Sequence, residues 1–370
     1  MTLRKLFGEN VDALKIKKVL SISILLSAVG LSMAACSNKS SSSNAKNADH
    51  SIALVTNNTG VDDHSFNQSA WEGLKRYGKA HDLLKGNGGY NYFESSSASD
   101  HIPNIEQAIN AKYKTIVGVG YELGDAINTE SKKHPKNNFI MIDNVINRKN
   151  VASATFKSND ASYLAGYAAA YTTKTNVVGF VGGAHGVILN LFDAGFAKGV
   201  ADAAKEQNKK IKIINAYVGD FSSVDKAKAI AKAMYANKAD VIYQVAATAG
   251  EGVFQEAKDI NTKKAANDKV WVIGVDSDQS SLGVYKDKDG KKSNFTLTST
   301  IKGIGKAVED IANKAYDGEF PGGKHFVYGL KGNGTYVVKG NMSDSAWAAV
   351  NKAKQNVIDG KVKVPTTPSN

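Results

Sequence analysis

The fold class is decided by the stretch Ile52-Ala53-Leu54-Val55-Thr56, which is followed by a polar loop and by apolar residues at helical spacing from Phe66 to Leu83. A short apolar run rich in β-branched residues is typical of a buried strand, and the longer periodic pattern is typical of a helix. The same order recurs in strands expected at 115–119 and 139–143, with a helix at 122–134 between them. This alternation predicts an α/β protein with parallel sheets and right-handed crossovers.

A second series of the same kind fills the rest of the chain. Strands are expected at 177–181, 212–217, 241–243 and 270–275, and helices at 191–207, 224–237, 305–316 and 345–358. The globular part has roughly 320 residues, more than one hydrophobic core normally serves, so two lobes are expected.

The N-terminus has the organisation of a signal peptide. Lys15, Lys17 and Lys18 precede an apolar run, 19–35, that is too short and too rich in serine for a membrane span. The run ends in Met33-Ala34-Ala35-Cys36, and Cys36 is the only cysteine of the chain. This ending resembles a bacterial lipobox, with Met33 where leucine is usual, and the resemblance implies that Cys36 is lipidated. An ordinary signal peptide with an incidental cysteine is the alternative.

The flanking segments and the net charge carry less information. Residues 36–50 are rich in Ser and Asn without apolar periodicity, which is typical of a flexible linker, and 363–370 are expected to form a flexible tail. The formal charge is +12, but the lysines are spread along the expected helices among acidic residues. A solvated surface is therefore favoured over nucleic-acid binding.

The common catalytic motifs are absent from the sequence. A glycine-rich turn at 118–124 has the wrong spacing for a dinucleotide, and there is no Walker loop, HExxH or Gly-x-Ser-x-Gly elbow. The seven histidines are scattered. We therefore expect no catalytic residues, no metal site, no cofactor and no enzyme activity, although no pattern in a sequence excludes a hydrolase triad.

Two polar loops follow expected strands, where open α/β sheets bind ligands. In the loop 56–68, Asp63 and Ser65 could be helix caps, whereas Phe66 beside Asn67 favours stacking on a planar ligand. Asp276 directly follows a second apolar strand and could accept hydrogen bonds from ligand hydroxyls or cap a helix.

The chain resembles the basic membrane protein family, the nucleoside-binding lipoproteins of ABC importers that are related to purine nucleoside receptors. The resemblance starts at 52–74 with Asp62-Asp63-His64-Ser65-Phe66-Asn67-Gln68 and runs along nearly all of the mature chain. Further matching motifs lie at 156–157, 164–167, 178–183, 192–196, 239–243, 272–276 and 298–302.

The resemblance implies roles for individual residues. Phe66 stacks on the base, Asn67 binds the ligand through its amide, Asp276 binds the ribose hydroxyls, and Lys302 belongs to the same site. The other expected ligand-binding residues are Asp143 and a second stacking ring from either Tyr243 or Phe192. Two more lie where the sequence departs from the family pattern, namely Asn57, where the family often has Asp, and Gly250, in the loop 247–250 that stands in place of a Gly-Gly-Thr-Gly-like loop.

The implied fold is that of type I periplasmic binding proteins, with two Rossmann-like lobes joined by three crossings. The expected first lobe is 51–153 plus 303–324, and the second is 154–302 plus 325–362. The implied protein is a monomer anchored through Cys36 on the extracytoplasmic face of the cell membrane. It binds a nucleoside, with purines favoured, and delivers it to an ABC permease. A sensor lipoprotein, or a receptor for a sugar or another small solute, is the alternative.

Overall fold

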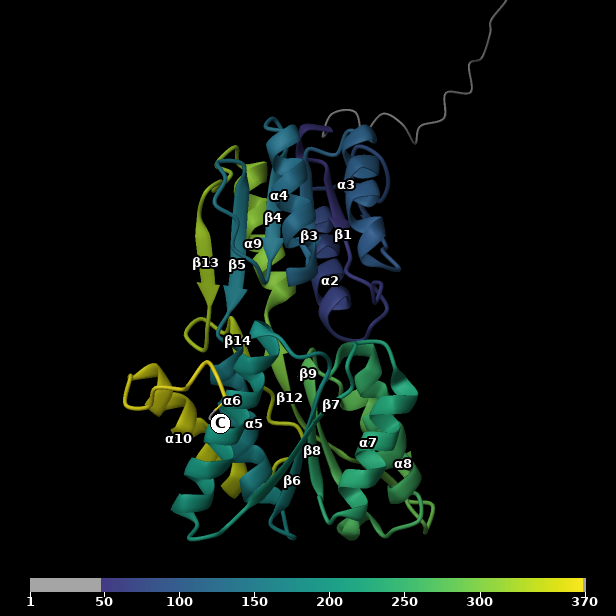
Figure 1. Ribbon diagram of the computed structural model, residues 1–370, viewed down its shortest axis with the longest axis vertical. Helices are drawn as coiled ribbons and strands as arrows, with labels where there is room; N and C mark the ends of the chain where they lie inside the picture. The colour runs from purple at the N-terminus through teal and green to yellow at the C-terminus, as the bar shows by residue number, and fades with distance from the viewer. Residues whose placement is uncertain (1–47, 369–370) are drawn as a thin grey trace, which may run out of the picture. The chain divides into compact units, whose positions relative to one another are not determined.

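The computed structural model describes residues 48–368, which belong to one compact unit, Ser40–Asn370. Two six-stranded sheets organise it, in the orders β13-β5-β4-β3-β1-β2 and β14-β12-β9-β8-β6-β7 (Figure 1). We call each sheet with the helices that cover it a lobe. The signal peptide, Cys36 and most of the predicted linker lie outside the described residues.

The first lobe has an all-parallel sheet with helices on both faces. Its elements are β1 (Ile52–Val55), α2 (Phe66–Ala80), β2 (Tyr90–Phe93), α3 (His101–Asn110), β3 (Thr115–Val119), α4 (Gly124–Lys133), β4 (Asn138–Ile142), β5 (Val151–Phe156), α9 (Ile304–Tyr316) and β13 (His325–Tyr328). Alternation along β1 explains the layers, because Leu54 packs with α2 and α9 whereas Ala53 and Val55 pack with α3 and α4.

The second lobe repeats this arrangement. Its elements are α5 (Ser158–Thr172), β6 (Val177–Gly182), α6 (Val187–Glu206), β7 (Lys212–Tyr217), α7 (Val224–Ala236), β8 (Val241–Val245), α8 (Glu251–Asn261), β9 (Trp271–Asp276), β12 (Thr296–Lys302), β14 (Thr335–Val337) and α10 (Asp344–Ile358). A small hairpin, β10 (Val284–Lys286) and β11 (Lys292–Asn294), is attached to it, and β14 is antiparallel to β12. Helices α5, α6 and α10 pack on one face, and α7 and α8 on the other.

The chain passes between the sheets three times, from β5 to α5, from β12 to α9 and from β13 to β14. The expected α/β class with parallel sheets is therefore confirmed. The predicted lobe boundaries differ from the sheets, however. Strand β5 continues past residue 153 to Phe156, and β13 pairs with it, so residues 325–328 lie in the first sheet rather than in the second lobe.

Both ends of the described chain are packed, in contrast to the linker and tail expected there. Residues Ala48–His50 form a 3-10 helix, and the His50 ring lies 4.1 Å from that of Tyr316. Val364 is buried, and Asn159 Nδ2 donates to its carbonyl at 3.1 Å. These contacts were not visible in the composition of either segment. Within residues 48–368, no helix has the length and apolarity required to cross a bilayer.

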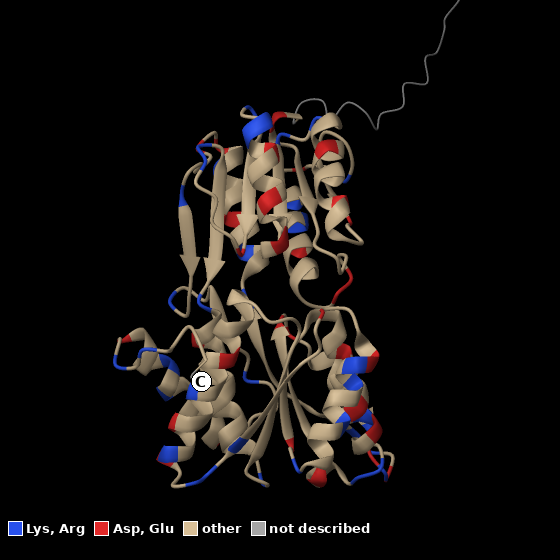
Figure 2. Ribbon diagram, in the orientation of Figure 1, with Lys and Arg blue, Asp and Glu red and all other residues tan. Residues whose placement is uncertain are grey.

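The distribution of charge agrees with a solvated surface. Figure 2 shows acidic and basic residues interspersed along α7 and α8. Two lysines of α7 have acidic partners, Lys226 with Asp220 at 3.2 Å and Lys228 with Asp259 at 2.7 Å.

Candidate functional site

A pocket lies between the two lobes, and its empty volume of about 500 Å³ includes space that is open to solvent. The first lobe contributes mostly polar and aromatic residues, namely Asn57, Phe66, Gly120, Tyr121, Glu122 and Asp143. The second lobe contributes mostly apolar residues, namely Ile188, Leu189, Phe192, Phe221, Val245, Ala247, Val275, Asp276 and Lys302.

The pocket is formed where strands of both sheets end. Asp143 directly follows β4, Asp276 ends β9 and Lys302 ends β12. Asp143 and Asp276 have φ values of 66° and 64°, in the left-handed region that Asp tolerates better than most residues. Non-glycine residues in this region cluster at functional sites, so the backbone conformation indicates a functional role for these two aspartates independently of their charge.

Lys302 lines the pocket and links the two lobes. Its side chain is buried, and its ammonium group forms an ion pair with the Asp143 carboxylate of the first lobe. The Lys302 Nζ atom also lies 4.8 Å from the ring centre of Phe66 and 5.9 Å from that of Phe192. A buried ammonium group in this position has both a carboxylate and aromatic faces to offset its desolvation.

Asp276 is the second buried carboxylate of the pocket, and only 8% of its surface is exposed. Burial raises the pKa of Asp276 to about 6, although Lys302 and a hydrogen bond from Ser65 lower it in part. The Ser65 hydroxyl donates to Asp276 Oδ2 at 2.7 Å. The carboxylate is therefore mostly ionised at neutral pH and can accept hydrogen bonds from ligand hydroxyls.

The pairing of α2 with α9 brings together two chain segments that lead into the site. Phe66 is the first residue of α2, and Lys302 lies just before α9. Gly73 and Gly305 allow the two helices to approach closely, since a Cβ on Gly73 would lie 2.2 Å from the Gly305 carbonyl oxygen.

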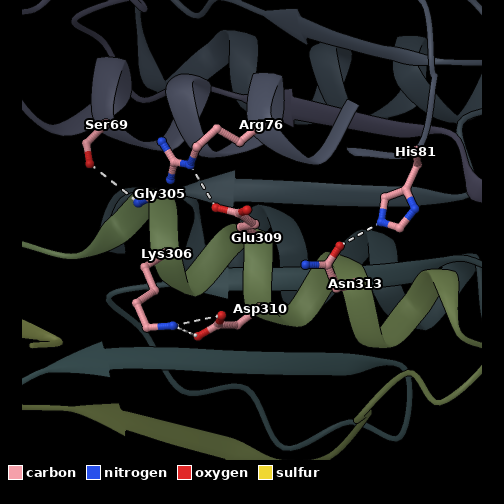
Figure 3. Close-up of polar contacts among 8 residues, drawn as sticks. All are labelled: Ser69, Arg76, His81, Gly305, Lys306, Glu309, Asp310 and Asn313. Carbon is pink, nitrogen blue, oxygen red and sulfur yellow. Dashed lines mark hydrogen bonds and ion pairs between the residues drawn. The ribbon is translucent and has the colours of Figure 1, made fainter. Parts of the chain in front are cut away.

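Polar contacts continue along this helix pair (Figure 3). The Ser69 hydroxyl accepts from the Gly305 amide at 3.4 Å, Arg76 pairs with Glu309 at 2.8 Å, and His81 Nε2 lies 2.7 Å from Asn313 Oδ1. Lys306 and Asp310 pair within α9 itself. The α2–α9 pair is therefore a support that fixes where Phe66 and Lys302 enter the pocket.

Three predicted ligand residues lie outside the pocket lining. Asn67 is buried, and its Nδ2 donates to Asn57 Oδ1 at 2.7 Å, so it orients the pocket residue Asn57 instead. Tyr243 is buried within β8 with its hydroxyl 2.8 Å from that of Thr300, which corrects its proposed role as a stacking ring. Gly250 packs against the Gln244 side chain, where a Cβ would lie 1.8 Å from Oε1.

Of the two candidate rings, it is Phe192 that lines the pocket, together with Phe221. Phe221 follows β7 in the polar loop Gly219-Asp220-Phe221-Ser222. A lone aromatic residue in a polar loop after a strand is the signal that indicates Phe66, and the same signal is present at Phe221.

Glu122 is a charged pocket residue outside the set expected from the sequence. It lies in the short 3-10 helix after β3, within the glycine-rich turn that has the wrong spacing for a dinucleotide. Burial raises its pKa, and Asp143 raises it further. The pocket therefore contains three carboxyl groups, those of Glu122, Asp143 and Asp276, and one ammonium group.

Comparison with known sequences gives matches over almost the whole chain. A family model described as ABC transporter substrate-binding protein PnrA-like matches residues 50–367. The chain is 47% identical to the ABC transporter nucleoside-binding protein BmpA of Lactococcus lactis, over 95% of this chain and 99% of that protein. It is 45% identical to the CD4+ T-cell-stimulating antigen of Listeria monocytogenes, over 96% and 98% of the two chains.

Solved structures share the fold at lower identity. A solute-binding protein of an ABC transporter system from Aeropyrum pernix superimposes with a TM-score of 0.73 at 21% identity, over 86% of this chain and 94% of that chain. One from Conexibacter woesei gives 0.62 at 18%, over 85% and 99%. These likenesses confirm the type I periplasmic-binding-protein fold. By its sequence, the chain belongs to the PnrA-like family of ABC transporter substrate-binding proteins.

Proposed function

We propose that this substrate-binding protein takes up a nucleoside between its lobes and presents it to the permease of an ABC importer. The observation that carries the proposal is a single pocket in which three phenylalanines accompany the buried groups of Asp143, Asp276 and Lys302. A nucleoside combines a flat base, which stacks on aromatic rings, with a sugar whose hydroxyls donate to carboxylates. The nucleoside-binding name of the Lactococcus lactis relative supports the same ligand class.

The charge of the pocket favours a ligand without phosphate groups. Glu122, Asp143 and Asp276 face the pocket with Lys302 as the one lysine or arginine among its lining residues, and Lys302 is already paired with Asp143. A phosphate dianion would enter a buried site with no free cation to compensate it, which is costly. We therefore infer that nucleosides bind and nucleotides do not. The preference for purines rests on the family resemblance.

We infer that binding acts by a shift of conformational population. The pocket takes residues from both lobes, so a ligand makes its full set of contacts only when the lobes are closed. A ligand that binds the closed state better stabilises that state. The two lobes would move as bodies about the three crossings, and the permease would recognise the closed form. This role requires binding and release, with no catalytic step.

We further propose that the protein is a monomer held on the extracytoplasmic face of the cell membrane by acyl chains on Cys36. Each buried methylene group of such a chain contributes roughly 0.8 kcal/mol. Residues between Cys36 and the first lobe would then connect the anchor to the binding unit.

The test of the ligand class is mass spectrometry of small molecules that co-purify with residues 40–370, which form one compact unit. We expect an intact nucleoside, released by denaturation in a ratio approaching one per protein. A sugar or another solute in that ratio would contradict the nucleoside proposal. Separate base and ribose after incubation with added nucleoside would indicate an enzyme instead.

A further inference from the structure

We propose that the loop preceding α2 is a latch that holds part of the ligand-free population in the closed arrangement of the lobes and that positions Asp276 for the ligand. The latch consists of His64 and Ser65 in the first lobe and Asp276, Ser277 and Gln279 in the second. Its closing role is independent of ligand identity, whereas its positioning role rests on the function proposed above.

Three hydrogen bonds form the latch. The Ser65 hydroxyl donates to Asp276 Oδ2 at 2.7 Å. The Ser277 hydroxyl donates to the His64 carbonyl oxygen at 2.7 Å, and Gln279 Nε2 donates to the same oxygen at 3.2 Å. All three bonds join residues more than 200 positions apart in the sequence, from different lobes.

The first-lobe side of the latch has a fixed shape. His64 has a φ of 51°, in the left-handed region, and this turn is held by the buried carboxylate of Asp63. That carboxylate accepts from the amides of Ser65 at 3.0 Å, Asn67 at 2.8 Å and Gln68 at 3.0 Å. Asp63 therefore caps the start of α2 and fixes the direction of the His64 carbonyl group.

The second-lobe side is equally constrained. Gln279 is buried, and its Oε1 accepts from Gln244 Nε2 at 2.7 Å and from the Val275 amide at 3.0 Å. With the carbonyl end of the side chain fixed in this way, the Nε2 group is directed at His64. Groups that are already ordered lose little conformational entropy when the lobes meet, so the latch forms readily without a ligand.

The latch also connects the two halves of the proposed ligand site. Ser65 is adjacent to Phe66, the ring expected to stack on the base, and its hydroxyl holds the carboxylate expected to bind the ribose. Asp276 therefore has its working orientation only when the lobes are closed. Ser65 is a positioning residue, since it acts on the ligand through Asp276.

The closing role is tested by distances between spin labels in ligand-free protein. Residues 40–370 contain no cysteine, because Cys36 is the only one in the chain. Gln107 on α3 and Gln255 on α8 are exposed sites on opposite lobes and can each be changed to cysteine for labelling. Ligand-free protein should show a closed population, and Ser277→Ala should lower the closed-to-open ratio by about 2- to 12-fold, the range for one neutral hydrogen bond.

Ser280→Ala is the matched control, because Ser280 lies in the same loop and makes its hydrogen bonds through its backbone. It should leave the distance distribution unchanged. A ligand-free protein that is entirely open, or a Ser277→Ala distribution identical to that of the parent protein, would overturn the closing role. Neither outcome depends on whether the ligand is a nucleoside.

The positioning role is tested by the pH profile of binding to the ligand that co-purifies. The charged groups around Asp276 are Lys302, Asp143 and Asp63, and they are unchanged in both serine variants. The Ser65 hydrogen bond lowers the pKa of Asp276, so Ser65→Ala should lower affinity and move the acid midpoint of binding to higher pH. Ser277→Ala should lower affinity with the midpoint unmoved. The same midpoint in Ser65→Ala as in the parent protein would overturn the positioning role.

Discussion

Removal of the Asp276 carboxylate should identify the sugar-binding group of the pocket. Asp276 is buried, has a pKa that burial raises to about 6, and lies at the end of β9 beside Lys302. A hydrogen bond to a charged group contributes about 1.5–3 kcal/mol, which corresponds to roughly 10- to 150-fold in affinity. We therefore expect Asp276→Ala to weaken binding of a ribonucleoside at least about tenfold. The parent protein should prefer a ribonucleoside over its 2′-deoxy analogue, and the variant should discriminate little between them.

Titration calorimetry with both ligands measures this directly, and circular dichroism establishes that the variant is folded. Asp278→Ala removes an exposed carboxylate two residues further along and is the matched control. It should bind as the parent protein does. Normal affinity of folded Asp276→Ala would refute the assignment of Asp276 to the ribose and reduce it to a structural residue.

The remaining predictions concern the base, the pH dependence and the anchor. Base–aromatic stacking contributes about 1–3 kcal/mol, so Phe66→Ala should weaken nucleoside binding roughly 5- to 150-fold in calorimetry and leave any ribose binding unaffected; unchanged nucleoside affinity would make Phe66 a core residue. Ligand hydroxyls donate to the ionised carboxylate, and burial raises the pKa of Asp276 to about 6, so nucleoside affinity should fall as the pH drops through about 6. A plot of affinity against pH that is as flat for the parent protein as for Asp276→Asn would contradict this. The free energy of unfolding of the ligand-free protein should have the opposite pH dependence in denaturant titrations. Between about pH 6 and pH 4 the folded form holds a proton on Asp276 that an unfolded aspartate with a pKa near 3.8 releases. The free energy of unfolding should therefore rise, relative to that of Asp276→Asn, as the pH falls from about 6 to about 4. Cys36→Ser should accumulate as unprocessed precursor or leave the membrane fraction, and a mature product that still partitions into detergent would exclude lipidation at Cys36.

The sequence was sufficient for the features that depend on local pattern. The strand at 52–55 and its polar loop predicted the parallel sheet and the location of Phe66, because a ligand-facing loop follows a buried strand. Asp276 was located by the same reasoning at the end of β9. Lys302 could be placed only through the family motif, since nothing local marks it as different from the surface lysines.

Features that depend on tertiary contacts could not be predicted. Strand β13 is short, and its place beside β5 rather than in the second sheet follows from a chain crossing that composition does not mark. Asn67 stands next to Phe66 in sequence, yet its amide is directed at Asn57 by hydrogen bonds from within its own loop. Tyr243 could have been excluded, because it lies in the interior of β8 rather than at its carboxyl end.

Calorimetric titration of residues 40–370 with a nucleoside and its 5′-monophosphate shows which ligand the pocket accepts, because the two differ only in the group that the pocket should reject. The pocket is lined by aromatic rings and carboxylates, to which we assign the base and the ribose, and its one ammonium group is already paired with Asp143. We predict saturable binding of at least one purine nucleoside with a stoichiometry of about one, and much weaker or undetectable binding of its monophosphate. Equal or tighter binding of the monophosphate, or no binding of any nucleoside by folded protein freed of co-purified ligand, would contradict the proposed role in nucleoside binding.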